Sequence, residues 1–286
     1  MRMKTPVESP WCWQNIHKPY LIFMIVAHGL AVWGVGRALQ GLIPWPTVAL
    51  AAVFYTCCVL SLTGGYHRLF SHAAYRGHPL LRVLYLLFGA ASGQNSALLW
   101  AADHRRHHAH ADQEGDPYNI KKGFWWAYVG WVIHRGPPPD ISNVQDLAAD
   151  PLIQFQHRFY LPLGVLTGAV LPAVVGLAWH DPLGAFLWAG FVRIVAVYHV
   201  TFGINSVAHT FGRQPHGQAD TARDNLFMAI VTLGEGYHNY HHTFPSDYRA
   251  GVRWYHFDPT KWWIWLMAQV GATTNLKRVV KPVSPP

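Results

Sequence analysis

Cysteine is scarce in this 286-residue sequence, and that scarcity excludes two common kinds of site. There are three cysteines, of which Cys57 and Cys58 lie in an apolar run where packing is the usual role, while Cys12 stands alone. This arrangement provides no disulfide framework and no set of thiolates for an iron–sulfur cluster. Any metal site in the chain therefore has to use other ligands.

Charge is scarce as well. Only 13% of the residues are charged, against roughly 25% in soluble domains, whereas 51% are hydrophobic and 14 are tryptophan. Low complexity is confined to the proline-rich tail at 282–286, and residues 1–19 lack the apolar core of a cleavable signal peptide. The composition predicts a membrane protein rather than a soluble or secreted one.

Four apolar stretches are each long enough to span a bilayer. We expect an all-α membrane protein with one domain over residues 1–286 and a cytosolic helical cap that carries a histidine-bound di-metal site. The cap is expected from 67–158 and 209–281. The four predicted transmembrane helices cover about 20–39, 47–66, 159–179 and 183–208.

A further apolar run at 79–100 allows two interpretations. It could cross the membrane as another helix, but that would put histidine clusters on opposite sides of the bilayer. An amphipathic or re-entrant helix at the membrane surface keeps them on one side, and we prefer this interpretation.

The basic residues predict the orientation. The formal net charge is +8, which could indicate nucleic-acid binding, but 20 of the 22 Lys and Arg lie in the N-terminal segment, the middle loop or the C-terminal part. Only Arg37 and Arg193 do not. The positive-inside rule then places both termini, the middle loop and all the histidine clusters in the cytoplasm, and we expect no nucleic-acid partner.

Histidine is abundant, with 19 residues, and nine of them fall into four clusters. On a helix, positions i, i+3 and i+4 project from one face, so each HxxHH is expected to point three imidazoles at one spot. Three to five imidazoles can bind one metal ion, so nine suggest two ions. The clusters are HRLFSH at 67–72, HRRHH at 104–108, NSVAH at 205–209 and HNYHH at 238–242.

The ligand type narrows the choice of metal. A structural zinc site usually has four ligands, often with cysteine, and is closed. With no cysteine and few carboxylates nearby, nine nitrogens favour a first-row ion such as iron over magnesium or calcium. An open di-iron site at a membrane surface indicates activation of dioxygen as co-substrate, on an apolar substrate that arrives from the bilayer or through a tunnel.

The three boxes HRLFSH, HRRHH and HNYHH resemble those of the integral-membrane fatty acid desaturases, and most closely those of the acyl-CoA Δ9 desaturases. The resemblance runs from about Tyr55 to Lys281. It includes Gly93-Gln-Asn-Ser, Trp100, Asp103-His104, Lys122-Gly-Phe, Val129-Gly-Trp131, Asn205-Ser-Val-Ala-His209 and the stretch GEGYHNYHHTFP at 234–245.

This resemblance implies a reaction and a ligand set. Dioxygen and two electrons would remove two hydrogens from adjacent methylenes of a C16–C18 acyl chain and leave a cis double bond. Asn205 would hold a metal-bound water, and no further catalytic residue is implied. Zinc can replace iron(II) in purified protein because zinc binds most such sites more tightly. The implied ligands of the two irons are His67, His72, His104, His107, His108, His209, His238, His241 and His242.

The resemblance also suggests substrate contacts. A tyrosine and an alanine close the tunnel in animal relatives, and the matching positions are Tyr55 and Val59. Because valine is larger, we expect a preference nearer sixteen carbons than eighteen, although both residues could simply be packing residues. Ala102 replaces an arginine of the family, so acyl-CoA, acyl carrier protein and membrane lipid all stay open as carriers. The matching head-group residues are Gln94, Asn95, Asp103 and Arg135.

Several partners and rival functions follow. Nothing in the chain resembles a cytochrome b5 domain, so a separate ferredoxin, rubredoxin or cytochrome b5 would donate electrons. The same histidine boxes occur in membrane hydroxylases, alkane monooxygenases and decarbonylases, while a metal transporter would place ionisable residues across its spans. Four arginines offer a surface for an acidic donor or, equally, for lipid headgroups: Arg213, Arg223, Arg249 and Arg253.

Overall fold

The part of the protein suited to the membrane is a bundle of four apolar helices. The computed structural model describes residues 13–136 and 139–279; Cys12 and the two ends of the chain lie outside these ranges. Within them, four helices are long and apolar enough to cross a membrane, and two histidine clusters gather at one end of the bundle. The predicted fold class is thereby confirmed. The helices cover Lys18–Leu39, Trp45–Ser71, Tyr160–Trp179 and Pro182–His209.

The second and fourth spanning helices are longer than the apolar stretches from which we predicted them. They extend to Ser71 and His209 and contain 27 and 28 residues. His67 and His209 therefore stand on the final turns of continuous helices rather than in the loops that follow. A residue on a buried helix is held more rigidly than one on a loop. This rigidity suits a histidine whose ring must keep a fixed orientation toward the other histidines.

The first span is one α-helix, whereas the other three are built from consecutive helical segments, several of them π-helical. The last part of the second span is such a π-helix, and π-helical turns are frequent at functional sites. The segments are α1 (Lys18–Leu39); α2 (Trp45–Leu60) and η2 (Ser61–Ser71); α8 (Tyr160–Val165), η6 (Leu166–Val170), α9 (Leu171–Gly176) and η7 (Leu177–Trp179); and α10 (Pro182–Ala185), η8 (Phe186–Val192), α11 (Arg193–Ser206) and η9 (Val207–His209).

The cap is formed by the chain between the second and third spans and the chain after the fourth. Antiparallel pairing of β1 (Arg76–Gly77) with β2 (Thr273–Thr274) joins these two parts. The first part contains α3 (Pro79–Ala91), α4 (Ala97–His110), η3 (Ile120–Lys122), η4 (Trp126–Gly130), α5 (Trp131–Ile133), η5 (Ser142–Val144), α6 (Gln145–Ala148) and α7 (Pro151–Arg158), and the second contains α12 (Leu226–Val231), α13 (His238–Thr243) and α14 (Pro259–Gln269); η1 (Trp13–Asn15) precedes α1.

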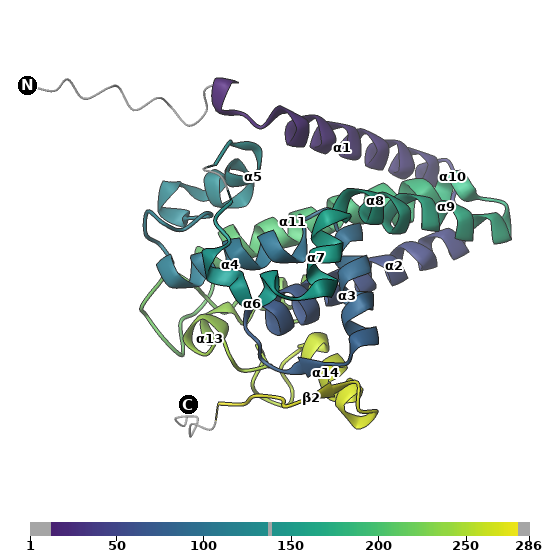
Figure 1. Ribbon diagram of the computed structural model, residues 1–286. Coiled ribbons are helices and arrows are strands. Elements are labelled where there is room, and N and C mark those ends of the chain that lie inside the picture. Colours follow the sequence, from purple (N-terminus) through teal and green to yellow (C-terminus); the bar gives the residue numbers. More distant parts are fainter. Residues whose placement is uncertain (1–12, 137–138, 280–286) are drawn as a thin grey trace, which may run out of the picture.

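The apolar run at 79–100 does not form a fifth span. It splits into α3, of 13 residues, and the start of α4, with a turn between them. At about 1.5 Å per residue α3 is about 20 Å long, which is shorter than the hydrocarbon core of a bilayer. Figure 1 shows α3 crossing the direction of α2 near the cap. The arrangement agrees with a helix at the membrane surface.

A buried arginine fastens the bundle from inside. Arg193 begins α11 and is 2% exposed. Its guanidinium donates to the carbonyl of Ala91 at the end of α3 and, at 2.9 Å, to the carbonyl of Gly168 in the third span. A charged group in a spanning helix is costly unless it is fully bonded, so this side chain ties three elements together.

We predict that Arg193→Met lowers the free energy of unfolding by about 2–4 kcal/mol, because two buried carbonyls lose their donor. Thermal unfolding of the detergent-solubilised protein measures this effect. Arg37→Met is the matched control, since Arg37 also lies on a spanning helix but its Nε has no hydrogen-bond partner. Equal losses in the two variants would contradict the assigned role of Arg193.

Candidate metal centre

Nine histidines from four separate segments meet in two groups at the cap end of the bundle. Within each group the ring nitrogens lie within 4.8 Å of one another. These are the same nine histidines that the sequence patterns singled out, whereas His110, close to them in sequence, belongs to neither group. Cluster A consists of His67, His72, His104, His108 and His241; cluster B consists of His107, His209, His238 and His242.

Each HxxHH motif contributes to both clusters. His104 and His108 belong to cluster A, but His107 belongs to cluster B. In the other motif the pair His238 and His242 belongs to cluster B and the third histidine to cluster A. The expectation that each motif points three imidazoles at one spot is therefore wrong. Residues i and i+4 share a direction, whereas i+3 and i+4 are neighbours about 100° apart around the helix.

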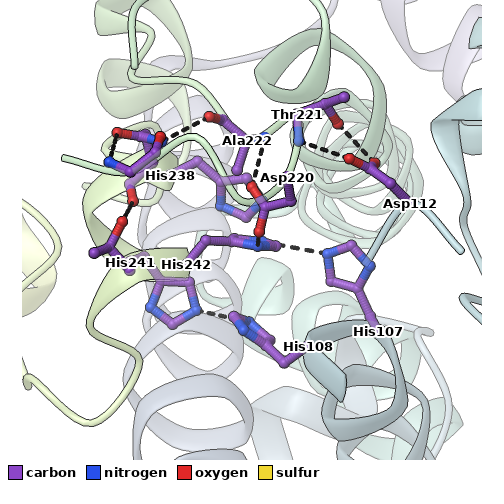
Figure 2. A network of polar contacts seen from close by, with 12 residues as sticks. His107, His108, Asp112, Asp220, Thr221, Ala222, His238, His241 and His242 are labelled. Atoms are coloured by element: carbon purple, nitrogen blue, oxygen red, sulfur yellow. Dashed lines mark hydrogen bonds and ion pairs between the residues drawn. The ribbon is translucent and has the colours of Figure 1, made fainter. Parts of the chain in front are cut away.

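The split arrangement brings adjacent histidines of α4 and α13 face to face (Figure 2). His107 Nε2 lies 3.3 Å from His242 Nε2, and His108 Nε2 lies 3.0 Å from His241 Nε2. His67, on the second span, places its Nε2 2.9 Å from that of His241. The two helices and the ends of two spans thus form one compact centre.

Carboxylates behind the histidines fix their orientation. Asp116 lies 2.9 Å from Nδ1 of His107, Asp220 lies 2.8 Å from Nδ1 of His242, and Glu235 lies 2.8 Å from Nδ1 of His67. The expectation of few carboxylates nearby is wrong, because these acids lie in loops and reach the histidines only through the fold. Carboxylate–histidine pairs of this kind are typical of metal sites.

The hydrogen bonds of these pairs are compatible with a metal ion between the rings. A carboxylate only accepts hydrogen bonds, so Nδ1 of His107 and of His242 must carry the proton. In a neutral ring Nε2 then bears a lone pair, and these two lone pairs face each other across 3.3 Å. A metal ion bound by both nitrogens would satisfy two such lone pairs, as would a proton shared between the rings. The donor set therefore fits a metal that takes imidazole ligands.

Burial keeps the rings neutral. Loss of solvent and then the charge of neighbouring groups lower the pKa of the cap histidines well below the ordinary value, so these rings are in the form that binds metals. The affected residues are His72, His104, His108, His238, His241 and His242.

Behind cluster A lies a buried ionic network. Arg68, next to His67, donates to Glu235 at 2.9 Å and to Asp258 at 3.1 Å. Burial alone would raise the pKa of Glu235, but the charge of Arg68, together with His67, lowers it to about 2. Glu235 thus stays ionised and can hold the His67 ring. Glu235 was not singled out from its sequence pattern, although it lies within the GEGYHNYHHTFP stretch at 234–245.

A cavity of about 580 Å³ opens beside the clusters. Histidines of both clusters line it, and it continues to an apolar inner end at Val59 and Leu62. Tyr55 is not among its lining residues; instead the Tyr55 hydroxyl donates to the carbonyl of Val231 at 2.6 Å. The other suggested substrate and water-binding residues all line the cavity, namely Gln94, Asn95, Asp103, Arg135 and Asn205.

Cations surround the mouth of this cavity. Arg106 lines it one helical turn after Ala102, and Lys122 and Arg135 line it as well. Arg106 was not singled out from the sequence, yet its position supplies a positive charge close to the site where Ala102 has none. Arg106 could have been found from the sequence, because residues four apart on a helix, such as Ala102 and Arg106, lie on the same face.

The surface arginines differ in their availability. Arg249 is paired with Asp247 at 2.8 Å, so it adds little to a basic surface. Arg213 and Arg253 are exposed, and Arg223 is half-buried. The four-arginine surface expected from the sequence is therefore reduced to three.

Comparisons with known proteins agree on one family. The family described as fatty acid desaturase matches residues 43–273. A probable acyl-CoA desaturase of Schizosaccharomyces pombe is 42% identical over 94% of this chain and 57% of its own length. Acyl-CoA desaturase 1 of Saccharomyces cerevisiae is 41% identical over 95% of this chain and 54% of its own length. The chain thus spans little more than half of these two relatives. The stearoyl-CoA desaturase of Sus scrofa is 35% identical over 85% of this chain and 71% of its own length.

We predict that Asp220→Asn weakens metal binding about 10–100-fold, because His242 loses the carboxylate that orients it. The measurement is the metal content, by mass spectrometry, after a chelator series. Asp140→Asn is the control, since Asp140 lies on the surface and only caps Ser142. If both variants retained metal equally, Asp220 would have no role in orienting a ligand.

Proposed function

The chain belongs to the fatty acid desaturase family, and from that premise we propose that it is a membrane di-iron acyl desaturase. The proposed reaction introduces a cis double bond, most simply at Δ9, into a saturated acyl chain of sixteen to eighteen carbons carried by CoA. The carbon chain loses two hydrogens, and dioxygen takes these together with two electrons and two protons to give two waters.

One observation carries this proposal. The cavity that the clusters share has histidines on its wall, cations at its mouth and an apolar inner end. An acyl chain would fit with its charged carrier at the mouth, its tail toward Val59 and its middle beside the histidines. A cavity of this kind selects which two methylenes lie at the metal centre, because tail and head are both fixed.

We assign the five nitrogens of cluster A to one iron and the four of cluster B to the other. The irons, when bound, would supply the oxidising power needed to break an unactivated C–H bond. The chain's own residues provide position and exclude water. Asn205 lines the same cavity, where it would hold a water near the ligands. Zinc is expected to compete for these nitrogens in purified protein.

The mouth residues support CoA as the carrier. Lys122 and Arg135 present two cations to a ligand that carries phosphates, and Arg106 adds a third that is paired with Asp103 at 3.5 Å. Acyl carrier protein and membrane lipid are the competing carriers. The side of the membrane follows from the basic residues: the proposal puts the clusters in the cytoplasm, where a separate one-electron donor would dock near Arg213 and Arg253.

We predict that a desaturase-deficient host that expresses this chain, with a compatible donor, gains a cis-Δ9 monoene. Mass spectrometry with double-bond location measures it. His107→Ala should abolish the product by disrupting cluster B, and His241→Ala by disrupting cluster A. The control His110→Ala should keep the product, because His110 belongs to neither cluster. A hydroxylated product would move the protein to the membrane hydroxylases. No product from iron-loaded protein would refute the acyl-chain proposal.

We predict that Val59→Ala shifts the product from sixteen toward eighteen carbons, by about tenfold, because the inner end of the cavity is enlarged by two methyl groups. Tyr55→Phe is the control: Tyr55 does not line the cavity, so this variant should lose its hydrogen bond to Val231 without a change in chain length. The measurement is the ratio of sixteen-carbon to eighteen-carbon monoene products in each variant, after the saturated acids of both lengths have been supplied. An unchanged product ratio in Val59→Ala would show that the end of the acyl chain does not lie at Val59.

A further inference from the structure

A second cavity, of about 320 Å³, lies between the first and third spanning helices. Its walls are mostly apolar and come from the N-terminal part of α1, the end of α3, the third span and residues 190–194 of the fourth. Phe23, Leu161, Val165, Phe191 and Ile194 are among its lining residues. Leu161 and Val165 are 71% and 49% exposed on the outer face of the third span. In a bilayer this face meets lipid tails, so the cavity opens toward the hydrocarbon.

Only a thin wall separates the two cavities. His17, Tyr20 and Gly93 line both of them, and Gly93 lies directly before the substrate residues Gln94 and Asn95. The wall is therefore one residue thick at this point. Tyr20 is the largest side chain that the two linings share, so its position bears on whether the lipid-facing cavity and the catalytic one are joined.

The first helix is attached on either side of this opening. At its start, the His17 amide donates to the Ile133 carbonyl at 2.7 Å. Further along, His28 Nε2 lies 3.1 Å from His199 Nε2 on α11, and the Gly34 carbonyl accepts from Trp188 at 2.8 Å. Figure 1 shows α1 running along one side of the bundle. Between these attachments Pro19, Tyr20 and Phe23 of α1 line the second cavity.

We propose that the second cavity is a lateral portal through which an acyl chain passes between the bilayer and the catalytic cavity. The proposal rests on the proposed desaturase function. A chain that enters sideways keeps its methylenes in apolar surroundings, whereas a chain threaded tail-first from the mouth must pass charged groups and water. The carrier stays at the cationic mouth while the chain crosses beside Tyr20.

Two tryptophan variants of one helix test the portal. Val165→Trp fills the cavity, whereas Val174→Trp adds the same bulk to a residue that is 55% exposed on the same span but does not line the cavity. The probe is palmitic acid with a mid-chain diazirine, photolysed with the protein in phosphatidylcholine nanodiscs. Peptide mapping should place label on residues of the second cavity in the parent and in Val174→Trp, and severalfold less in Val165→Trp.

This labelling needs neither metal nor turnover, so its outcome is independent of the desaturase proposal. Turnover of palmitoyl-CoA in nanodiscs is the second readout, and it should fall severalfold in Val165→Trp at unchanged metal content. Label that appears only in the catalytic cavity, or equal label in the two variants, would refute the portal. Label in the second cavity with undiminished turnover in Val165→Trp would also overturn it as a route.

Discussion

Convergence of nine largely buried imidazoles is the constraint on which the rest of the structure depends. Ring nitrogens gathered this closely need a cation or a shared proton between them, so the fold has to hold the rings in place. It does so with anchors on the opposite ring nitrogens, such as Asp116, Asp220 and Glu235. The anchors are themselves bonded; Glu235, for instance, is held by the buried guanidinium of Arg68.

The membrane bundle supplies the stiffness that this centre requires. Two spanning helices run on without interruption to the clustered histidines His67 and His209, so the position of these rings follows from the packing of the bundle. Arg193 draws α3 and the third span together by their backbone carbonyls. The cap contributes α4 and α13, each of which carries an HxxHH motif and closes over the end of the bundle (Figure 1).

Much of this could be predicted from the sequence, because hydropathy and histidine spacing are local signals. The four spans, the absence of a fifth among the described residues and the family resemblance are of this kind, and the comparisons confirm the resemblance. The division of each motif between two clusters could not be predicted, since it depends on how α4 and α13 are rotated against each other. Asp116 and Glu235 were missed for a similar reason: an acid's partner is set by tertiary packing. The role of Tyr55 at the tunnel end stays a prediction, and its side chain lies outside the lining of the cavity.

Each HxxHH motif is divided between the two clusters, and this division bears on the order in which two metal ions would bind. His107 and His108 are neighbours on one rigid helix but belong to different clusters, and His241 and His242 repeat this on the other. An ion bound in one cluster would therefore constrain both helices, and with them the histidines of the other cluster. Such coupling would be reciprocal. Occupation of one cluster would then favour occupation of the other.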